Sequence, residues 1–193
     1  MVYPLTALFL ALLALLLVGV IIRIRRAWRR AEILQHVGLQ LNSTIRRKEL
    51  LQRIMETTAS TMSAEGSSII LVDEEKGELY FEVATGDKNE EVKEIRLKRG
   101  EGIAGWVAEH GKPVLIADAA KDPRWSNRVS AKVNIPTRNM LCVPVVSNGR
   151  TLGVLQVINK KGRGKARFTT RDLRLLEMIA SPTAIALENM RLA

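Results

Sequence analysis

Apolar and polar residues follow three different patterns along this 193-residue chain. Residues Met1 to Ile22 carry no charged side chain. Between Ala31 and Gln52 apolar residues recur at close to helical spacing, and from Ser67 onward short runs alternate with a period of two. The pattern predicts an apolar helix, then a linking helix, then a domain in which strands and helices mix.

The apolar segment is long enough to cross a membrane. As a helix its uncharged residues would span about 33 Å at ~1.5 Å per residue, against a hydrocarbon core of about 30 Å. A secretory signal peptide would need basic residues before the apolar run and small residues at its end, and this run has neither. We therefore predict a retained transmembrane anchor at residues 1–24, followed by a basic juxtamembrane and linker helix at residues 25–44.

The charge beside the anchor predicts its orientation. Because basic residues stay on the cytoplasmic side of a membrane helix, we expect the arginines that follow the apolar run to lie at the cytoplasmic interface. The chain would then be a single-pass protein of the bacterial inner membrane, with its N-terminus outside, the lipid bilayer as a partner and the domain in the cytoplasm. These arginines are Arg23, Arg25, Arg26, Arg29 and Arg30.

Residues 45–193 carry the signals of one α+β domain. Asn148-Gly149 lies between two apolar runs and predicts a hairpin with a type I′ turn. Helices are expected at Ile103–His110, near Lys121–Val133 and from about Thr170 to the end. We predict an antiparallel sheet with the N- and C-terminal helices packed together on one face. The predicted strands are Ser67–Val72, Glu78–Thr85, Ile95–Lys98, Val114–Ile116, Met140–Val146 and Thr151–Ile158.

Composition narrows the range of functions. The net charge is +10, and half of it comes from the five juxtamembrane arginines. The remaining excess is modest and no nucleic-acid-binding motif accompanies it, so we expect no nucleic-acid partner. Cys142 is the single cysteine, which excludes an internal disulfide or a cysteine metal cluster, and His36 and His110 are isolated from each other. No metal site and no catalytic constellation is predicted.

Five dispersed motifs, taken in order, resemble the GAF domain family. They are GEGIAGWV at 100–107, DPRW at 122–125, MLCVPV at 140–145, LGVLQVINK at 152–160 and FTTRD at 168–172. The resemblance implies a cytoplasmic small-molecule sensor or dimerisation module, of the kind found in cyclic-nucleotide phosphodiesterases, phytochromes and bacterial histidine kinases. It implies no single ligand.

The family's nucleotide-associated signature is present with one departure. Asn159, Lys160, Phe168 and Asp172 match it, but Leu173 stands where the family has Glu. In the family the Lys and the Asp are thought to pair and to brace the pocket. The same stretch also has the form of a helix-capping box, with Thr169 as N-cap, Asp172 as its partner, and Phe168 packing on Leu173. We favour bracing and capping over direct contact with a cyclic nucleotide.

Candidate ligand contacts come mainly from the polar stretch 117–138, which resembles the segment that forms the pocket lid in GAF domains. The alternative is an ordinary surface excursion, and the sequence leaves both open. The six candidates are Asp118, Trp125, Asn127, Arg138, Asn159 and Lys160.

These observations predict a membrane-tethered sensor without catalytic activity. It would bind a small molecule or form a homodimer through its N- and C-terminal helices, and pass a signal to a separate effector protein. One alternative is a ligand-free structural scaffold. Another is an enzyme resembling free methionine sulfoxide reductases, but these work through several cysteines. No haem is expected, and no bilin, because Cys142 is followed by Val143 where bilin-binding relatives have His. The ligand is left open.

Overall fold

The computed structural model describes residues 48–86, 89–134, 136–164 and 166–192. The predicted anchor at 1–24, the linker helix at 25–44 and the arginine cluster from Arg23 to Arg30 lie outside these residues. Within the described ranges, none of the helices combines the length and the apolar character that a membrane span requires.

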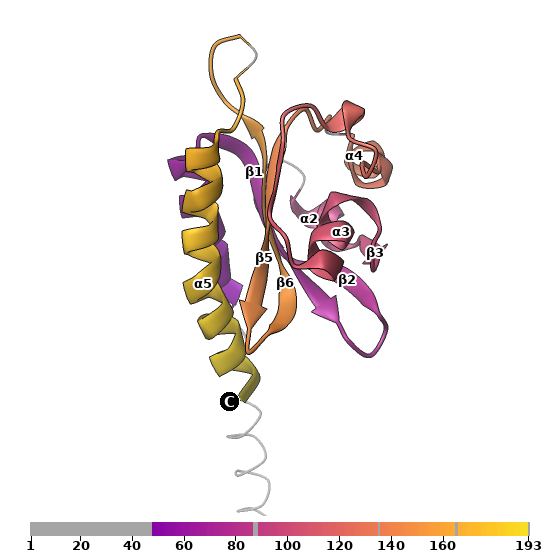
Figure 1. Ribbon diagram of the computed structural model, residues 1–193, viewed down its shortest axis with the longest axis vertical. Helices are drawn as coiled ribbons and strands as arrows, with labels where there is room; N and C mark the ends of the chain where they lie inside the picture. Colours follow the sequence, from indigo (N-terminus) through magenta and orange to yellow (C-terminus); the bar gives the residue numbers. More distant parts are fainter. Residues whose placement is uncertain (1–47, 87–88, 135, 165, 193) are drawn as a thin grey trace, which may run out of the picture. The chain divides into compact units, whose positions relative to one another are not determined.

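The centre of the domain is a six-stranded antiparallel sheet, with the strand order β3-β2-β1-β6-β5-β4. Both ends of the sheet are short strands, and the two longest strands lie at its middle (Figure 1). The strands are β1 (Ala64–Asp73), β2 (Glu78–Ala84), β3 (Arg96–Lys98), β4 (Val114–Ile116), β5 (Met140–Ser147) and β6 (Arg150–Lys160). The helices are residues 48–61, α2 (Asn89–Lys93), α3 (Gly102–His110), α4 (Arg128–Val133) and α5 (Thr170–Leu192), with a 3-10 turn η1 at Ala119–Lys121.

This architecture confirms the predicted α+β class and all six predicted strand regions. The hairpin between β5 and β6 turns at Asn148 (φ 49°) and Gly149 (φ 73°), the two positive φ values that a type I′ turn requires. Two details differ from the prediction. Helix α2 has no counterpart in it, and the helix expected near Lys121–Val133 divides into η1 and the shorter α4.

The N- and C-terminal helices share one face of the sheet, as the apolar pattern predicts. Alternate residues of the central strands, such as Ile69 and Leu155, point to this face and are fully buried. Leu51 and Met55 pack there from helix 48–61, and Leu176 packs there from α5. Figure 1 shows α5 running along the sheet, in front of helix 48–61. We call this the helix face.

The other face is covered by the short helices α2, α3 and α4 (Figure 1). The intervening residues of the same strands point to it, including Ile70 and Val154. Ile103 and Val107 of α3 complete this second core. We call this the cavity face, because the site described below lies within it.

Two glycines allow backbone segments to approach closely. A Cβ atom on Gly153 of β6 would collide with the carbonyl oxygen of Ile70 on the neighbouring strand. A Cβ on Gly105 of α3 would lie 2.8 Å from the carbonyl carbon of Gly100. The second contact holds the turn before α3 against the helix, and so fixes the helix N-terminus that faces the cavity.

Candidate functional site

A cavity of about 100 Å³ lies between the cavity face of the sheet and the helices that cover it. Its floor is mostly apolar, and its roof comes from Trp125, Ser126 and α4. The N-terminus of α3 closes one side. The lining residues are Gly66, Ser67, Ser68, Ile70, Phe81, Ala84, Thr85, Val92, Leu97, Glu101, Gly102, Ile103, Ala104, Trp125, Ser126, Val129, Ser130, Thr137, Met140, Gln156 and Ile158.

The floor of the cavity carries a polar group that has no partner in the described part of the chain. Ser68 is only 4% exposed, lines the cavity, and makes no side-chain hydrogen bond to any residue within the described ranges. Gln156 lies directly opposite Ser68 on β6 and is half-buried in the same lining. A buried hydroxyl without a partner costs free energy, so these neighbouring groups mark a place where a ligand or water is needed.

The beginning of α3 adds hydrogen-bond donors to the same cavity. Glu101 precedes the helix but its side chain makes no capping bond, and Gly105 is the first residue whose amide bonds back, to the carbonyl of Glu101. The amides of Gly102, Ile103 and Ala104 therefore have no backbone acceptor among the described residues. Amides without a backbone acceptor and the positive end of the helix dipole together favour a carbonyl or an anionic group at this position.

The roof of the cavity, which we call the lid, comprises residues 122–134. Its first residues are fixed to α3. Arg124 donates to both carboxylate oxygens of Asp122, at 2.9 and 2.8 Å, and its guanidinium lies 4.5 Å from the centre of the Trp106 ring. Trp106 in turn stacks on His110, with ring centres 4.3 Å apart. The bonds from Arg124 lower the pKa of the Asp122 carboxyl. Trp125 follows immediately and reaches the cavity.

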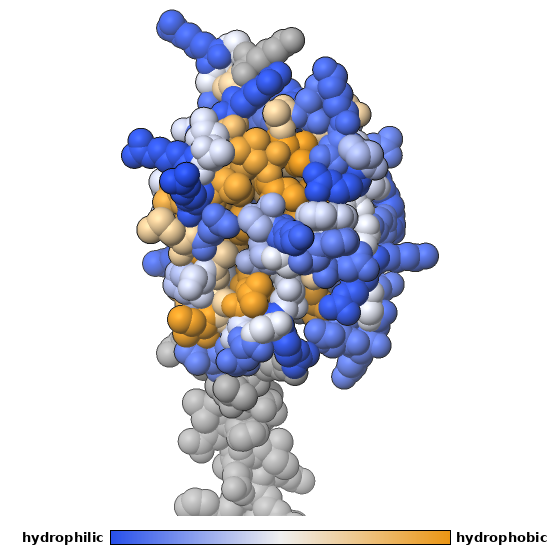
Figure 2. All heavy atoms as spheres, viewed as in Figure 1, coloured by the Kyte–Doolittle hydropathy of each residue, from blue (hydrophilic) through white to orange (hydrophobic). Residues whose placement is uncertain are grey.

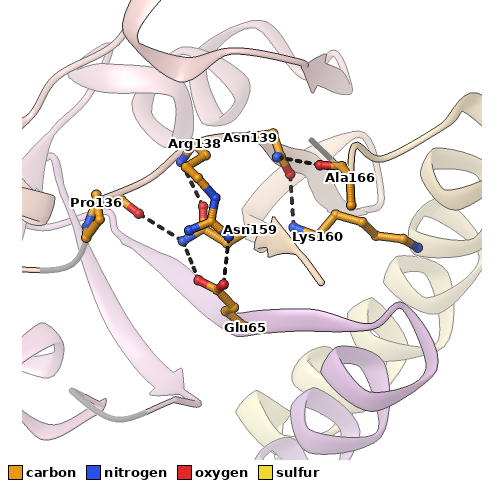
Figure 3. A network of polar contacts seen from close by, with 7 residues as sticks. All are labelled: Glu65, Pro136, Arg138, Asn139, Asn159, Lys160 and Ala166. Atoms are coloured by element: carbon orange, nitrogen blue, oxygen red, sulfur yellow. Dashed lines mark hydrogen bonds and ion pairs between the residues drawn. The ribbon is translucent and has the colours of Figure 1, made fainter. Parts of the chain in front are cut away.

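The segment that follows the lid is held by a polar network around Asn159 (Figure 3). Asn159 is fully buried and adopts a positive φ of 57°. Its side-chain oxygen accepts from the amide of Arg138 at 2.7 Å, and its side-chain nitrogen donates to Glu65 at 2.8 Å and to the carbonyl of Pro136 at 2.9 Å. Arg138 also donates to Glu65 at 2.6 Å. Burial alone would raise the pKa of the Glu65 carboxyl, but the bonds from Arg138 and Asn159 bring it below its ordinary value.

The residue after Asn159 joins this network to the N-terminus of α5. Lys160 contacts Asp172 at 3.1 Å, and its ammonium lies 5.5 Å from the centre of the Phe168 ring. The amide of Thr169 donates to Asp172 at 2.8 Å, and the amide of Asp172 donates back to the Thr169 hydroxyl at 3.3 Å. This is the predicted capping box, and the predicted pairing of Lys160 with Asp172 accompanies it.

The six candidate ligand contacts occupy different places. Trp125 lines the cavity. Asn159, Lys160 and Arg138 lie instead in the polar network described above. The side-chain oxygen and nitrogen of Asn159 both have protein partners there. Asp118 lies 3.5 Å from Lys121 on the surface, and Asn127 precedes α4 without a side-chain capping bond. None of these five belongs to the cavity lining.

Sequence reasoning missed Ser68, Gln156 and the open N-terminus of α3. Ser68 left one signal, since it is a polar residue two positions before Ile70, on the same face of a strand that continues with the apolar run Ile69–Val72. Gln156 is the corresponding polar position within β6. The open helix terminus left none, because the sequence does not show that the Glu101 carboxylate accepts from the Lys98 amide and bonds Arg128 instead of capping α3.

The described residues offer little for redox or metal chemistry. Cys142 is fully buried in the cavity-face core, and burial raises the pKa of its thiol far above the usual range. Among the residues that the structure places, no group of three or more His, Cys, Asp or Glu side chains is arranged to hold a metal ion.

Known proteins match most of this chain. A family model for the GAF domain matches residues 44–188. A probable 3′,5′-cyclic phosphodiesterase of Caenorhabditis elegans, pde-5, is 32% identical over 149 residues, which are 72% of this chain and 20% of the relative. The dual 3′,5′-cyclic-AMP and -GMP phosphodiesterase 11A of Takifugu rubripes is 33% identical over 142 residues, 64% of this chain and 16% of the relative. The chain thus spans a fifth or less of these relatives.

Solved structures agree on the fold. The GAF domain of a phosphoenolpyruvate-protein phosphotransferase from Coxiella burnetii superposes with a TM-score of 0.68 and 21% identity, over 79% of this chain and 94% of that one. The segment shared with the phosphodiesterases is a GAF domain, so these matches assign no enzymatic activity to this chain.

Proposed function

The chain belongs to the GAF domain family, and from that premise we propose that it is a sensor which binds a small molecule in the cavity under the lid and passes the signal to a separate effector protein. The single observation that carries this proposal is the buried Ser68 hydroxyl, which lines the cavity and has no hydrogen-bond partner among the residues that the structure describes. A purely structural domain gains nothing from such a group, because filling the site with an apolar side chain would remove its cost.

The composition of the lining indicates the kind of ligand. Apolar floor residues and Trp125 suit a flat ring, Ser68 and Gln156 suit its polar edge, and the amides of Gly102 to Ala104 suit a carbonyl or an anion. Because two relatives are named as cyclic-nucleotide phosphodiesterases, cyclic AMP and cyclic GMP are the first molecules to test. The cavity of about 100 Å³ is smaller than the usual range of ligand pockets, about 300–1,000 Å³, so a nucleotide would require the lid to move.

Calorimetric titration of the full-length chain with each cyclic nucleotide tests the proposal. Replacing Ser68 with Ala should weaken the binding of either nucleotide by roughly threefold to tenfold, the value of one hydrogen bond. The matched control is Ser147→Ala, at a half-buried serine outside the cavity lining. The affinity of Ser147→Ala for each cyclic nucleotide should equal that of the unmodified protein.

A null result in the titrations leads to a second measurement. Native mass spectrometry of the full-length chain, released from detergent, would show a different small molecule that co-purifies with it. If neither measurement finds a ligand, the sensor proposal is wrong and the ligand-free scaffold takes its place.

We also propose that residues 1–24 anchor the chain in the bacterial inner membrane, with the domain in the cytoplasm. The support is the uncharged run Met1–Ile22 followed by five arginines. An alkaline-phosphatase fusion after Ala193 should be inactive in a bacterial host, and a green fluorescent protein fusion at the same place should fluoresce. An active phosphatase fusion would contradict this orientation.

Homodimerisation through the terminal helices is the proposed route for the signal. Met178 and Ile185 lie two turns apart on α5 and are 71% and 61% exposed, and Leu50 of helix 48–61 is 47% exposed. Figure 2 shows apolar side chains among hydrophilic ones on the side of the molecule where α5 lies. Sedimentation of the full-length chain in detergent should give a dimer, and Met178→Glu with Ile185→Glu should give a monomer. Equal masses for the unmodified chain and the double variant would contradict dimerisation through these helices.

A further inference from the structure

An ion pair joins the lid to the N-terminus of α3 across the cavity. One guanidinium nitrogen of Arg128, the first residue of α4, lies 2.8 and 3.0 Å from the two carboxylate oxygens of Glu101. Glu101 lines the cavity beside the first residues of α3, and α4 lines it through Val129 and Ser130. The pair therefore connects the two sides of the cavity.

The two partners differ in how firmly they are held. Glu101 is fixed by the turn before α3, because its carboxylate accepts from the amide of Lys98 at 2.9 Å and its own amide donates to the carbonyl of Lys98 at 3.0 Å. Glycines with positive φ flank it on both sides, Gly100 at 78° and Gly102 at 68°. Its carboxylate cannot follow α4 outward without disrupting this turn.

Arg128 belongs to the more weakly packed side. Helix α4 has six residues, and every one whose burial is described is half-buried or exposed. In α3, by contrast, five residues are buried. Elements with few buried contacts are the ones that open locally at low free-energy cost. The ion pair thus ties a helix that has no buried residue among those described to a turn that backbone and side-chain hydrogen bonds hold in place.

We propose that the Glu101–Arg128 pair is a latch that controls the opening of α4 above the cavity, and hence the entry and release of a ligand. This inference concerns the regulation of the site in the proposed function, and its relevance to sensing rests on that function. The latch itself exists in the ligand-free protein and can be tested there. It acts electrostatically between partly exposed groups, so salt should loosen it.

Hydrogen–deuterium exchange of the full-length chain, read by mass spectrometry, measures the opening. Peptides covering residues 128–134 should exchange roughly two- to fivefold faster in Arg128→Gln and in Glu101→Gln, the range for a partly exposed ion pair. The double variant should be no faster than either single one, because both substitutions remove the same interaction. Raising the salt from about 0.05 to about 0.5 M should speed exchange in the unmodified chain and leave Arg128→Gln unchanged.

The matched control is Lys132→Gln, which removes the same charge from an exposed position of the same helix. Peptides from α5 report whether the rest of the fold is intact. If residues 128–134 exchange equally in Arg128→Gln and in Lys132→Gln, the latch is refuted.

Cyclic GMP as a probe separates this inference from the proposed function. Faster lid exchange in Arg128→Gln, with no binding of cyclic GMP or of any co-purified molecule, would support the latch and contradict the sensor. If the unmodified chain and Arg128→Gln both bind cyclic GMP, with identical dissociation rates and identical exchange of the lid, the result would support the sensor and contradict the latch.

Discussion

The two faces of the sheet are built from the same strands but satisfy their polar groups in opposite ways. Ser67 and Ser68 are neighbours on β1, and both are 4% exposed. The hydroxyl of Ser67 donates to the carbonyl of Met55 at 2.7 Å and lies 2.9 Å from the hydroxyl of Thr85. The hydroxyl of Ser68 has no such partner among the described residues. Ser67 is thus satisfied within the protein, whereas Ser68 on the cavity face retains unused hydrogen-bonding capacity.

The N-termini of α5 and α3 differ in the same way. On the helix face, α5 begins with a capping box made by Thr169 and Asp172. On the cavity face, α3 begins without a side-chain cap, and its first residues line the cavity. A single sheet can therefore carry residues that stabilise the fold on one face and residues that bind a ligand on the other. This is possible because consecutive residues of a strand point to opposite faces.

The largest expected effect comes from truncating a core side chain on each face. Leu155→Ala on the helix face should lower the free energy of unfolding by about 4 kcal/mol, since it leaves a void among tightly packed neighbours. Met140→Ala beside the cavity should cost only about 2 kcal/mol, because part of its surroundings is already empty. Urea denaturation measures both. Equal losses would mean that the two faces are packed alike.

The adjacent serines give the sharpest version of the comparison. Ser67→Ala should destabilise the domain by about 1–3 kcal/mol, because the Met55 carbonyl and the Thr85 hydroxyl lose a buried partner. Ser68→Ala should leave the free energy of unfolding unchanged or raise it by about 1 kcal/mol, because it breaks no bond to a described residue and removes a buried hydroxyl that lacks a partner there. Urea denaturation of the two variants shows which serine contributes more to stability. A larger loss for Ser68 in the ligand-free protein would show that its hydroxyl is structurally committed.

The cap of α5 should contribute less than the buried serine. Thr169→Ala removes the acceptor for the amide of Asp172 and should cost about 1 kcal/mol, with or without a ligand. Thr170→Ala is the control, an exposed threonine one position further into the helix. Thermal unfolding should separate the two variants by a few degrees. A loss of ligand affinity in Thr169→Ala without any loss of stability would contradict the bracing role.

The smallest effect concerns pH. Burial would raise the pKa of the Asp172 carboxyl, but bonds from the Thr169 amide and from Lys160 bring it below its ordinary value. The stabilisation is therefore fully present above the ordinary pKa of an aspartate and is lost as the pH falls through the lowered pKa of the folded state. Unfolding free energies between about pH 5 and pH 2 should fall less steeply in Asp172→Asn than in the unmodified chain. If the unfolding free energies of the two proteins fell in parallel with pH, the stabilising contribution of the Asp172 carboxylate would be contradicted.

Features with a local signal were predictable from the sequence. The Asn148-Gly149 turn, the strand runs and the Thr169–Asp172 cap depend on residues within a few positions of one another. The family resemblance added the pairing of Lys160 with Asp172.

Features that depend on distant partners were not predictable. Asn159 acts through contacts with Glu65, Pro136 and Arg138, and nothing in its neighbourhood in sequence specifies them. The same is true of the latch, since Glu101 and Arg128 lie 27 positions apart in the sequence. Most of the site is made of such contacts, which is why the fold was easier to predict than the cavity.

The order of the strands has a consequence for biosynthesis. The central pair places Ser68 of β1 opposite Gln156 of β6, and every other strand lies between them in the chain. A ribosome must therefore release nearly the whole domain before β1 can acquire its inner neighbour. Until then β1 has only the hairpin with β2, and its apolar residues are open to wrong partners. A pairing of such long range is also slow to form. The emerging chain is thus most exposed to aggregation between the synthesis of β2 and that of β6, and chaperone binding should be strongest over that interval.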